Sequence, residues 1–469
     1  MYFKQFLVLI FLSLGFTTMA QDTSKTLNSK QVISLVRKFH PIVKQTEIYI
    51  EESRASLLLA KGAFDPLLQG YSARKTLDGV NYYNYNSPSL TLPTWFGIEL
   101  QTGVENLSGS RLNPSQTSGS IGYLGASIPL AKDLIIDKRR AALKQAKIVK
   151  SMALVDQKAV VNDLLMNTME AYWQWVKAYQ TYEVVKNNVT INQTRFELVK
   201  KSYLNGERAG IDTLEAMAQL QSFQYLQNMR WLEFQNAGLQ LSTFLWTPDG
   251  EPYNLPENII PQKDWETETV LTDFNVSLNN LLEQANQNHP ELQLYDYKLD
   301  VLAIESKLKF QELLPKLDFQ YNYLSKGYAN LYSEPLMPLF ENNYNYALKF
   351  EVPLRLSQGR GSYKLAKLKI QDTELSQDQK RIAIQAKVKS YYNEMMNLQA
   401  QIDLQTKNYG MYQQLVKAEE GRFFNGESSL FLINSRENKA LEALEKLIEL
   451  KTKYSKTLYA LQWSAGLLQ

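Results

Sequence analysis

The stretch from His289 to Tyr323 reads HPELQLYDYKLDVLAIESKLKFQELLPKLDFQYNY, and it predicts a helix that passes into a strand. Proline is tolerated in the first turn of a helix, so His289-Pro290 is read as a helix start. The residues up to Pro315 contain no other proline and no glycine. After Pro315 apolar and polar residues alternate, which is the two-residue period of a strand with one apolar and one polar face.

The same pattern occurs earlier in the chain, at an offset of 249 residues. His40-Pro41 opens this first copy, and Pro66 follows the histidine by the same 26 residues that separate His289 from Pro315. Internal repeats of this kind define the architecture of a chain before any motif does. The sequence is therefore read as two tandem copies of one structural unit.

The first copy contains an insertion between its strands. Pro66 and Pro129 are 63 residues apart, whereas Pro315 and Pro353 are 38 residues apart, which leaves 25 extra residues. The insertion is rich in Gly, Ser, Asn and Tyr and includes one more strand-like run, 98–104. If the chain crosses a membrane as β-strands, we expect two membrane-spanning strands from each copy. The extra strand is then expected to belong to an outer loop or to pair outside the bilayer.

Each strand region is followed by a very long helical stretch. Residues 137–203 contain neither proline nor glycine, and a helix of that length would extend on the order of 100 Å. Two adjoining apolar stripes near its start follow coiled-coil spacing, which indicates neighbours on two sides, as in a ring of helices. An ordinary soluble coiled coil explains one stripe well and two less well.

The composition excludes several classes of site. Lys and Arg total 51 against 48 Asp and Glu, which is too balanced for a nucleic-acid binder. There is no cysteine, so thiolate metal sites and cysteine nucleophiles are excluded. There are only two histidines, so a His-rich metal centre is excluded. No phosphate-binding loop, paired-His metal motif or nucleophile elbow occurs. We therefore expect no catalytic, cofactor-binding or metal site, and no enzyme.

The predicted organisation begins with a secretory signal peptide. Lys4, an apolar run and small residues before Ala20 have the order of a cleaved signal, and the run is too short for a membrane anchor. The expected boundaries are 1–20 signal peptide; 21–246 first repeat, with strands about 67–130 and a helical hairpin about 137–246; 247–276 linker; 277–469 second repeat, with strands about 317–354 and a hairpin about 359–466.

These features together resemble the TolC-like outer-membrane efflux channels. The matching residues include HPEL at 289–292, LLPKL at 313–317, RRAA at 139–142 and the Pro-Leu strand ends, in the same order in both copies. The resemblance implies an α+β membrane protein, in which a trimeric β-barrel in the outer membrane continues into a periplasmic α-helical barrel. It also implies a periplasmic adaptor and an inner-membrane pump as partners.

Four strands per chain are too few to close a barrel around a pore, and three chains would supply twelve. Aromatic residues on one strand face suit the girdles of such barrels, although the inner face of a soluble sandwich would also carry them. The residues expected to face lipid are Tyr321, Tyr323, Tyr344, Tyr346 and Phe350.

The two helical turns are the predicted functional site. The resemblance implies that these tips contact the coiled-coil hairpin of the adaptor. The tip residues are Asn205, Gly206, Glu207, Arg208, Asn425, Gly426 and Glu427.

The resemblance also implies that acidic residues beyond a tip narrow the entrance, and Asp212 and Glu215 match that pattern. The second copy has Leu432 and Ser435 instead, although better-known members have their acids in the second copy. The alternative is that both acids only favour a helix N-terminus.

The predicted function is that of a passive outer-membrane conduit in a tripartite efflux or type I secretion system. A periplasmic or surface coiled-coil scaffold without a pore is the alternative. The scaffold explains the helices but leaves the duplicated amphipathic strands unexplained.

Overall fold

A computed structural model of the chain describes residues 25–112, 118–262, 264–267, 277–325 and 342–468. The predicted signal peptide lies outside the described residues. The chain divides into two compact units. The hairpin unit comprises Met1–Val36, Thr168–Thr272 and Leu398–Lys456, and the sheet unit comprises Arg37–Asn167, Asp273–Asn397 and Thr457–Gln469.

Each copy starts its part of the sheet unit with a helix of 22 residues, α2 (Pro41–Gly62) and α6 (Pro290–Gln311). The histidine before each helix is its N-cap. Nδ1 of His40 accepts a hydrogen bond of 3.2 Å from the Ile42 N–H, and Nδ1 of His289 accepts one of 3.2 Å from the Glu291 N–H. Burial lowers the pKa of both histidines, which favours the neutral ring that can accept such a bond. The prediction that the His-Pro pairs start helices is confirmed.

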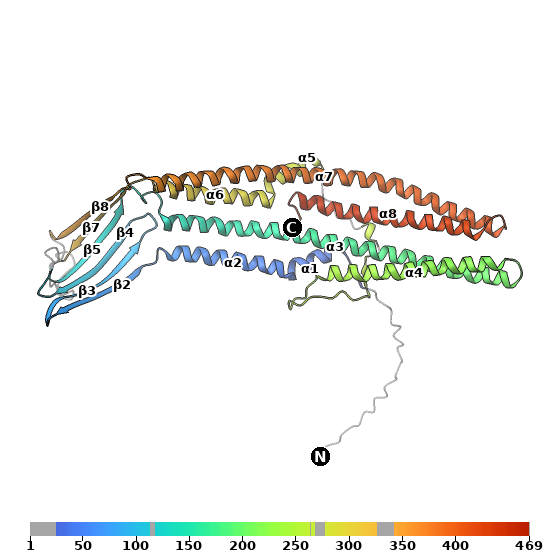
Figure 1. Cartoon of the computed structure of the whole chain (residues 1–469), viewed down its shortest axis with the longest axis horizontal. Helices are drawn as coiled ribbons and strands as arrows, with labels where there is room; N and C mark the ends of the chain where they lie inside the picture. Colours follow the sequence, from blue (N-terminus) through green and yellow to red (C-terminus); the bar gives the residue numbers. More distant parts are fainter. Residues whose placement is uncertain (1–24, 113–117, 263, 268–276, 326–341, 469) are drawn as a thin grey trace, which may run out of the picture. The chain divides into compact units, whose positions relative to one another are not determined.

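The sheet unit contains one antiparallel sheet of six strands, in the order β2-β3-β4-β5-β7-β8 (Figure 1). The strands are β2 (Leu67–Leu77), β3 (Val80–Pro93), β4 (Glu99–Ser108), β5 (Gly119–Pro129), β7 (Lys316–Leu324) and β8 (Tyr344–Glu351). Within the part of the chain that is described, β2 and β8 are the two edges, and each pairs with one neighbour only.

The first copy contributes four strands to the sheet, one more than the strand-like runs seen in its sequence. The additional strands belong to the same sheet, since β3 pairs with β2 and β4 pairs with β5. A two-residue turn explains the difference. Asp78 and Gly79 have φ of 52° and 77°, and Asp-Gly is a preferred sequence for such tight hairpins. Which of the four cross a bilayer stays a prediction.

The five aromatic residues predicted to face lipid share one face of the sheet. Tyr321 is paired with Tyr346, and Tyr323 is paired with Tyr344. Phe350 lies on the same face of β8 and is 65% exposed. Paired residues of neighbouring strands point to the same side, so these side chains form one apolar surface at this edge of the sheet.

Long helices account for most of the remaining chain: α3 (Lys138–Leu204), α4 (Gly210–Ser242), α7 (Ser357–Phe424) and α8 (Leu430–Ser464). Shorter elements are α1 (Ser29–Phe39), α5 (Leu278–Asn288), the 3₁₀ helix η1 (Trp265–Thr267), and the parallel pair β1 (Lys25–Leu27) and β6 (Ile259–Pro261). In the described residues, no helix combines the length and the apolar character needed to cross a membrane.

Aromatic side chains form the core of the hairpin unit where α3 meets α4. Tyr172, Trp173 and Trp175 on α3 are at most 2% exposed. The rings of Trp175 and Phe234 of α4 stack with centroids 6.1 Å apart. Trp173 also meets the ring of Trp265 at 6.3 Å, which attaches the segment after α4 to this core.

Candidate functional site at the helical tips

The two helical turns of the hairpin unit have the same backbone geometry. Gly206 between α3 and α4 and Gly426 between α7 and α8 both have a φ of 78°. The N–H of Gly206 donates to Tyr203 O at 3.0 Å, and the next N–H donates to Ser202 O at 2.9 Å. The second turn repeats both bonds, at 3.0 Å and 2.8 Å. Glycine is needed because side chains disfavour this conformation.

Most of the predicted tip residues are exposed. Asn205, Gly206 and Glu207 in the first turn are exposed, and so are their counterparts Asn425, Gly426 and Glu427 in the second. No Cβ built on either glycine would meet another atom within 4 Å. The conformation of these glycines, and not a lack of space, is therefore what the turns require.

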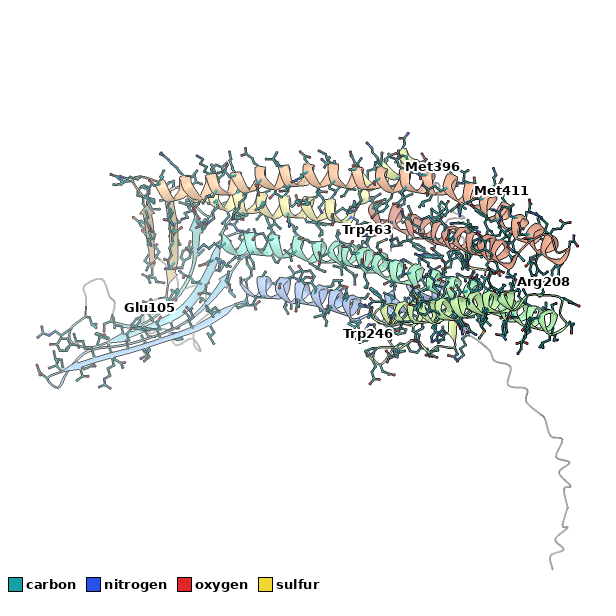
Figure 2. The ribbon with its side chains drawn as sticks, turned by 45° about the vertical axis from the view of Figure 1, so that its right-hand side comes forward. Glu105, Arg208, Trp246, Met396, Met411 and Trp463 are labelled. Atoms are coloured by element: carbon teal, nitrogen blue, oxygen red, sulfur yellow. The ribbon has the colours of Figure 1, made fainter. Side chains whose placement is uncertain are left out.

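Arg208 joins the two turns and is only partly exposed (Figure 2). Its Nη2 donates to the backbone oxygen of Phe423 at 2.9 Å. Its guanidinium also lies 4.0 Å from the centre of the Phe423 ring, which is the geometry of a cation–π contact. The end of the first hairpin is thus bonded to the end of the second.

Large apolar side chains are exposed beside both glycines. Leu204 and Phe424 occupy equivalent positions before the two Asn-Gly pairs and are 73% and 76% exposed. Ile211 and Phe431 are equivalent residues just beyond the turns and are 71% and 68% exposed. Scattered apolar residues on a surface are normal, but a cluster repeated at two equivalent tips is typical of an interaction site.

Asp212 and Glu215 lie in the first two turns of α4 and are partly exposed. Burial and then the charge of Asp212 raise the pKa of Glu215. The two carboxylates therefore interact across one helical face, as their spacing predicts. In the second copy the equivalent Leu432 and Ser435 are exposed and uncharged.

A buried ion-pair network further along the hairpin was not predicted from the sequence. Arg195 of α3 makes two bonds to the Glu437 carboxylate of α8, at 2.7 Å and 2.8 Å. It makes a third bond, of 2.9 Å, to Glu420 of α7. Asn192 adds a hydrogen bond of 3.2 Å to Glu437. One guanidinium thus connects three helices.

The network is shielded from water. The side chains of Arg195 and Glu437 are 12% and 7% exposed. Burial alone would lower the pKa of Arg195, but the bonds to Glu437 and the charge of Glu420 outweigh it and raise that pKa. Arg230 of α4 pairs similarly with Glu445 of α8 at 2.8 Å. In the sequence these acids are indistinguishable from those on a solvated helix face, so no signal would have identified them.

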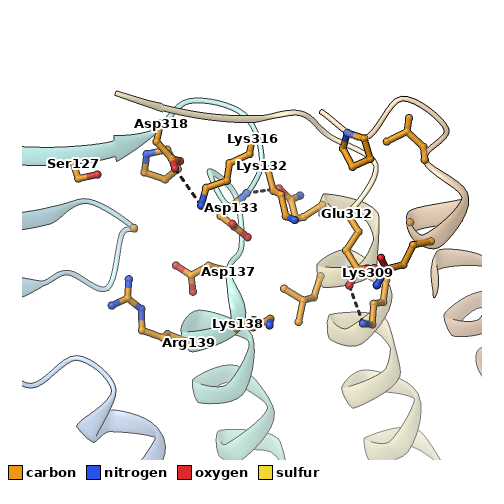
Figure 3. Close-up of a pocket in the computed structure, with 18 of the residues that line it drawn as sticks. Ser127, Lys132, Asp133, Asp137, Lys138, Arg139, Lys309, Glu312, Lys316 and Asp318 are labelled. Carbon is orange, nitrogen blue, oxygen red and sulfur yellow. Dashed lines mark hydrogen bonds and ion pairs between the residues drawn. The ribbon is translucent and has the colours of Figure 1, made fainter. Parts of the chain in front are cut away.

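A second charged region lies in the sheet unit, around a cavity of about 630 Å³. Figure 3 shows acidic and basic side chains around it, from the β5–α3 connection, the start of α3, α6 and β7. Several are already paired: Lys316 with Asp318 at 3.4 Å, and Lys309 with Glu312 at 2.9 Å. Across the described ranges, no group of three His, Cys, Asp or Glu side chains is arranged to hold a metal ion.

Comparison with known proteins gives the family. The family model described as "Outer membrane efflux protein" matches residues 32–245 and 281–467. The chain belongs to this outer membrane efflux protein family. The search of curated proteins gives no match.

Solved structures share the fold of this efflux protein at low sequence identity. The Campylobacter jejuni CmeC outer membrane channel is 16% identical over 93% of this chain and 85% of its own, with a TM-score of 0.64. Vibrio cholerae VceC, an outer membrane protein, is 15% identical over 93% and 96%, with a TM-score of 0.62. The open state of the Neisseria gonorrhoeae MtrE outer membrane channel is 13% identical over 94% and 89%, with a TM-score of 0.61.

These findings confirm the resemblance seen in the tandem repeats. The α+β fold class and the outer-membrane location follow from them, as does the assignment to efflux. The family match covers two segments, 32–245 and 281–467, and leaves residues 246–280 unmatched. The predicted domain boundaries stay predictions. The roles of the tip residues and of the aromatic face stay predictions.

Arg195→Met is expected to loosen the hairpin unit, because it leaves the buried Glu437 carboxylate without its charged partner and with only the Asn192 hydrogen bond. Breaking a buried pair on one side costs about 3–5 kcal/mol. Hydrogen exchange of the intact protein should therefore show lost protection in α3, α7 and α8 around the network. Arg381→Met is the matched control, since Arg381 pairs with an exposed Asp378. Unchanged protection in Arg195→Met would contradict the role of the network.

Proposed function

We propose that this efflux protein is a passive trimeric conduit that docks a periplasmic adaptor and works with an inner-membrane pump. Proteins of its family are trimeric channels that work with adaptor proteins and pumps. A conduit needs no reacting group of its own, which agrees with a composition poor in histidine and free of cysteine. The conduit carries cargo, and the pump supplies energy.

The observation that carries the proposal is a set of exposed apolar stripes at heptad spacing. On α4 the stripe has a period of seven residues and consists of Ile211, Ala218, Tyr225, Leu232 and Leu239. Its four large members, which are all of these except Ala218, are 57–71% exposed. On α7 Leu368, Leu375 and Ile382 repeat the period and are 48–70% exposed. Figure 2 shows Met411, 63% exposed, on the side of α7 away from α8.

Such stripes are the seams that coiled coils bury against a neighbouring helix. No described element of the same chain covers them, since each large residue in them is about half exposed or more. Leaving them in water would cost roughly 25 cal/mol for each Å² of apolar surface. Copies of the chain placed side by side in a ring bury all of these stripes at once.

The first prediction from this proposal concerns the mass of the assembly. The detergent-solubilised protein from the outer-membrane fraction should have the mass of three chains after subtraction of bound detergent. Tyr225→Glu and Leu232→Glu together should reduce the trimer fraction, whereas Lys201→Glu, an exposed change outside the stripe, should not. A monomer in the soluble fraction would support the scaffold without a pore instead.

The tips supply the docking surface for the adaptor in this proposal. Leu204, Phe424, Ile211 and Phe431 present apolar side chains beside turns whose backbone is fixed by glycine. An amphipathic helical hairpin buries its apolar face against such a surface. The exposed Asn205, Glu207, Asn425 and Glu427 then supply the polar rim of the contact.

Photo-crosslinking in cells tests this docking. A photoreactive residue at position 204 or 424 should crosslink to a periplasmic adaptor with a predicted coiled-coil hairpin, identified by mass spectrometry. The matched control is the same residue at position 77, because Leu77 is also exposed but lies at the β2–β3 turn. Equal adaptor crosslinking from all three positions, or none from the tips, would contradict the assignment.

Asp212 and Glu215 form the proposed entrance constriction. Threefold symmetry would repeat each carboxylate three times around the axis, and a ring of acids favours cations. Asp212→Asn and Glu215→Gln are therefore expected to lower the cation preference of single channels in planar bilayers. Glu207→Gln is the control, because it removes an exposed tip charge outside this helical face.

The pH dependence follows from the direction of the Glu215 shift. A carboxyl with a raised pKa is charged above that pKa and becomes neutral sooner as the pH falls. Burial and Asp212 raise the pKa of Glu215, so cation preference should decline on acidification before ordinary glutamates are protonated. Glu215→Gln should remove this step. Identical pH profiles in the variant and the unmodified protein would exclude Glu215 from the constriction.

A further inference from the structure

The β3–β4 hairpin (Val80–Ser108) belongs to the first copy, and among the described residues the second copy has no hairpin that corresponds to it. It lies in the middle of the sheet order and not at an edge, since β2 flanks it on one side and β5 on the other. Its place relative to the bilayer decides how many strands each chain contributes. Three features of the sheet unit bear on that place.

The first feature is how far the hairpin extends along the sheet. Its β3–β4 turn is closed by a bond of 3.0 Å from the Thr94 N–H to Ile98 O. Nη1 of Arg140, in the first turn of α3, donates to Phe96 O in this turn at 3.2 Å. Because α3 follows β5 directly, the turn lies at the end of the sheet where β5 enters the helix. The hairpin therefore extends to the same end of the sheet as its neighbours.

The second feature is an apolar band of two successive rows of paired residues that crosses the hairpin near the β3–β4 turn. Further from that turn the same face is polar, where Asn86 is paired with Asn106. One row of paired residues crosses all six strands: Leu68, Leu90, Thr102, Leu124, Tyr323 and Tyr344. The next row crosses five: Leu92, Leu100, Ala126, Tyr321 and Tyr346. Apart from the tyrosines, Thr102 is the one residue of these two rows whose side chain can form hydrogen bonds. Its hydroxyl donates to Tyr123 O at 2.9 Å.

The opposite face is polar along the same strands. Gln101 of β4 donates to Asn322 Oδ1 of β7 at 2.9 Å, and Asn322 donates to Asn345 Oδ1 of β8 at 2.9 Å. Gly125 lies between them on β5, and a Cβ there would come within 1.9 Å of Asn322 Oδ1. The missing side chain lets the amides meet. The hairpin thus shares one apolar face and one polar face with β5, β7 and β8.

The third feature is a pair of aromatic residues in the turn. Trp95 and Phe96 are 76% and 51% exposed, and their ring centroids are 5.5 Å apart. Trp and Phe exposed at the end of an apolar strand face are typical of the girdles at a membrane–water boundary. A turn that lay in water outside the bilayer would not need exposed aromatic side chains.

We propose that the β3–β4 hairpin crosses the outer membrane with its apolar face against lipid hydrocarbon, so that each chain supplies six strands. The inference rests on the proposed trimer, in which β2 of one copy pairs with β8 of the next and three copies form eighteen strands. Open strand edges are not tolerated in lipid, and this pairing removes both of them. The strands have 8 to 14 residues, close to the roughly 9–11 that cross a bilayer.

The added strands widen the barrel. With strands about 4.8 Å apart and tilted by about 40°, eighteen strands give a backbone diameter of about 36 Å, against about 24 Å for twelve. Barrels of this strand number enclose an aqueous channel. The polar face with its amide contacts would line that channel.

Single-cysteine labelling tests the proposal directly, because the chain contains no cysteine of its own. Leu90→Cys and Leu100→Cys would each carry a fluorescent label in the full-length protein, reconstituted in vesicles that contain a brominated phospholipid. Both labels should lose most of their fluorescence to the lipid quencher, as a label at Leu348→Cys on β8 should. Ser89→Cys and Thr91→Cys, on the opposite face of β3, should instead be quenched by aqueous iodide.

The outcomes separate the two proposals. Lipid quenching at position 348 without quenching at 90 and 100 would overturn the spanning hairpin and leave a channel of four strands per chain. No lipid quenching at any of the three positions would contradict the membrane-spanning sheet itself, and with it the conduit. Quenching at all three positions, with eighteen strands counted in an electron cryo-microscopy map, is the expected result.

Discussion

A helix of 67 or 68 residues cannot bury its apolar side chains by folding back on itself, and this constraint governs the rest of the molecule. The returning helices α4 and α8 have 33 and 35 residues, so they cover only part of α3 and α7. The remaining length is covered in part by α2 and α6, which have 22 residues each. What is left exposed is a set of heptad stripes, which are the kind of surface that coiled coils bury against a neighbouring helix.

The two tandem copies are more alike in local backbone geometry than in side-chain chemistry. Both histidine N-caps use the same ring nitrogen at the same distance, and both tip glycines have the same φ. By contrast, Asp212 and Glu215 have no acidic counterparts, and within the described ranges the second copy has no counterpart of the β3–β4 hairpin. Backbone geometry is what the helices need in order to start and turn. The unequal residues are where the two copies contribute different chemistry to the assembly.

Much of the architecture could be predicted from the sequence because it depends on periodic patterns. Helix starts at His-Pro, turns at Asn-Gly and strands that alternate polar and apolar residues are all short-range signals. The four-strand first copy carried such a signal as well, since Asp78-Gly79 between strand-like runs is a hairpin sequence. The Arg195 network carried none, because burial of a charged residue depends on three helices meeting and not on its sequence neighbours.

The two contacts that join the hairpins, at Arg195 and at Arg208, differ in strength. Arg195 makes three hydrogen bonds to the buried Glu437 and the partly exposed Glu420, and hydrogen bonds to charged groups are worth about 1.5–3 kcal/mol each. Arg208 makes one hydrogen bond to a backbone oxygen and one cation–π contact, worth about 0.5–1.5 and 0.5–1 kcal/mol. The contact at the extreme tip is therefore the weaker one. Opening that separates the turns breaks the Arg208 contact first, while Arg195 keeps the helices together about 13 residues, or roughly 20 Å of helix, further back.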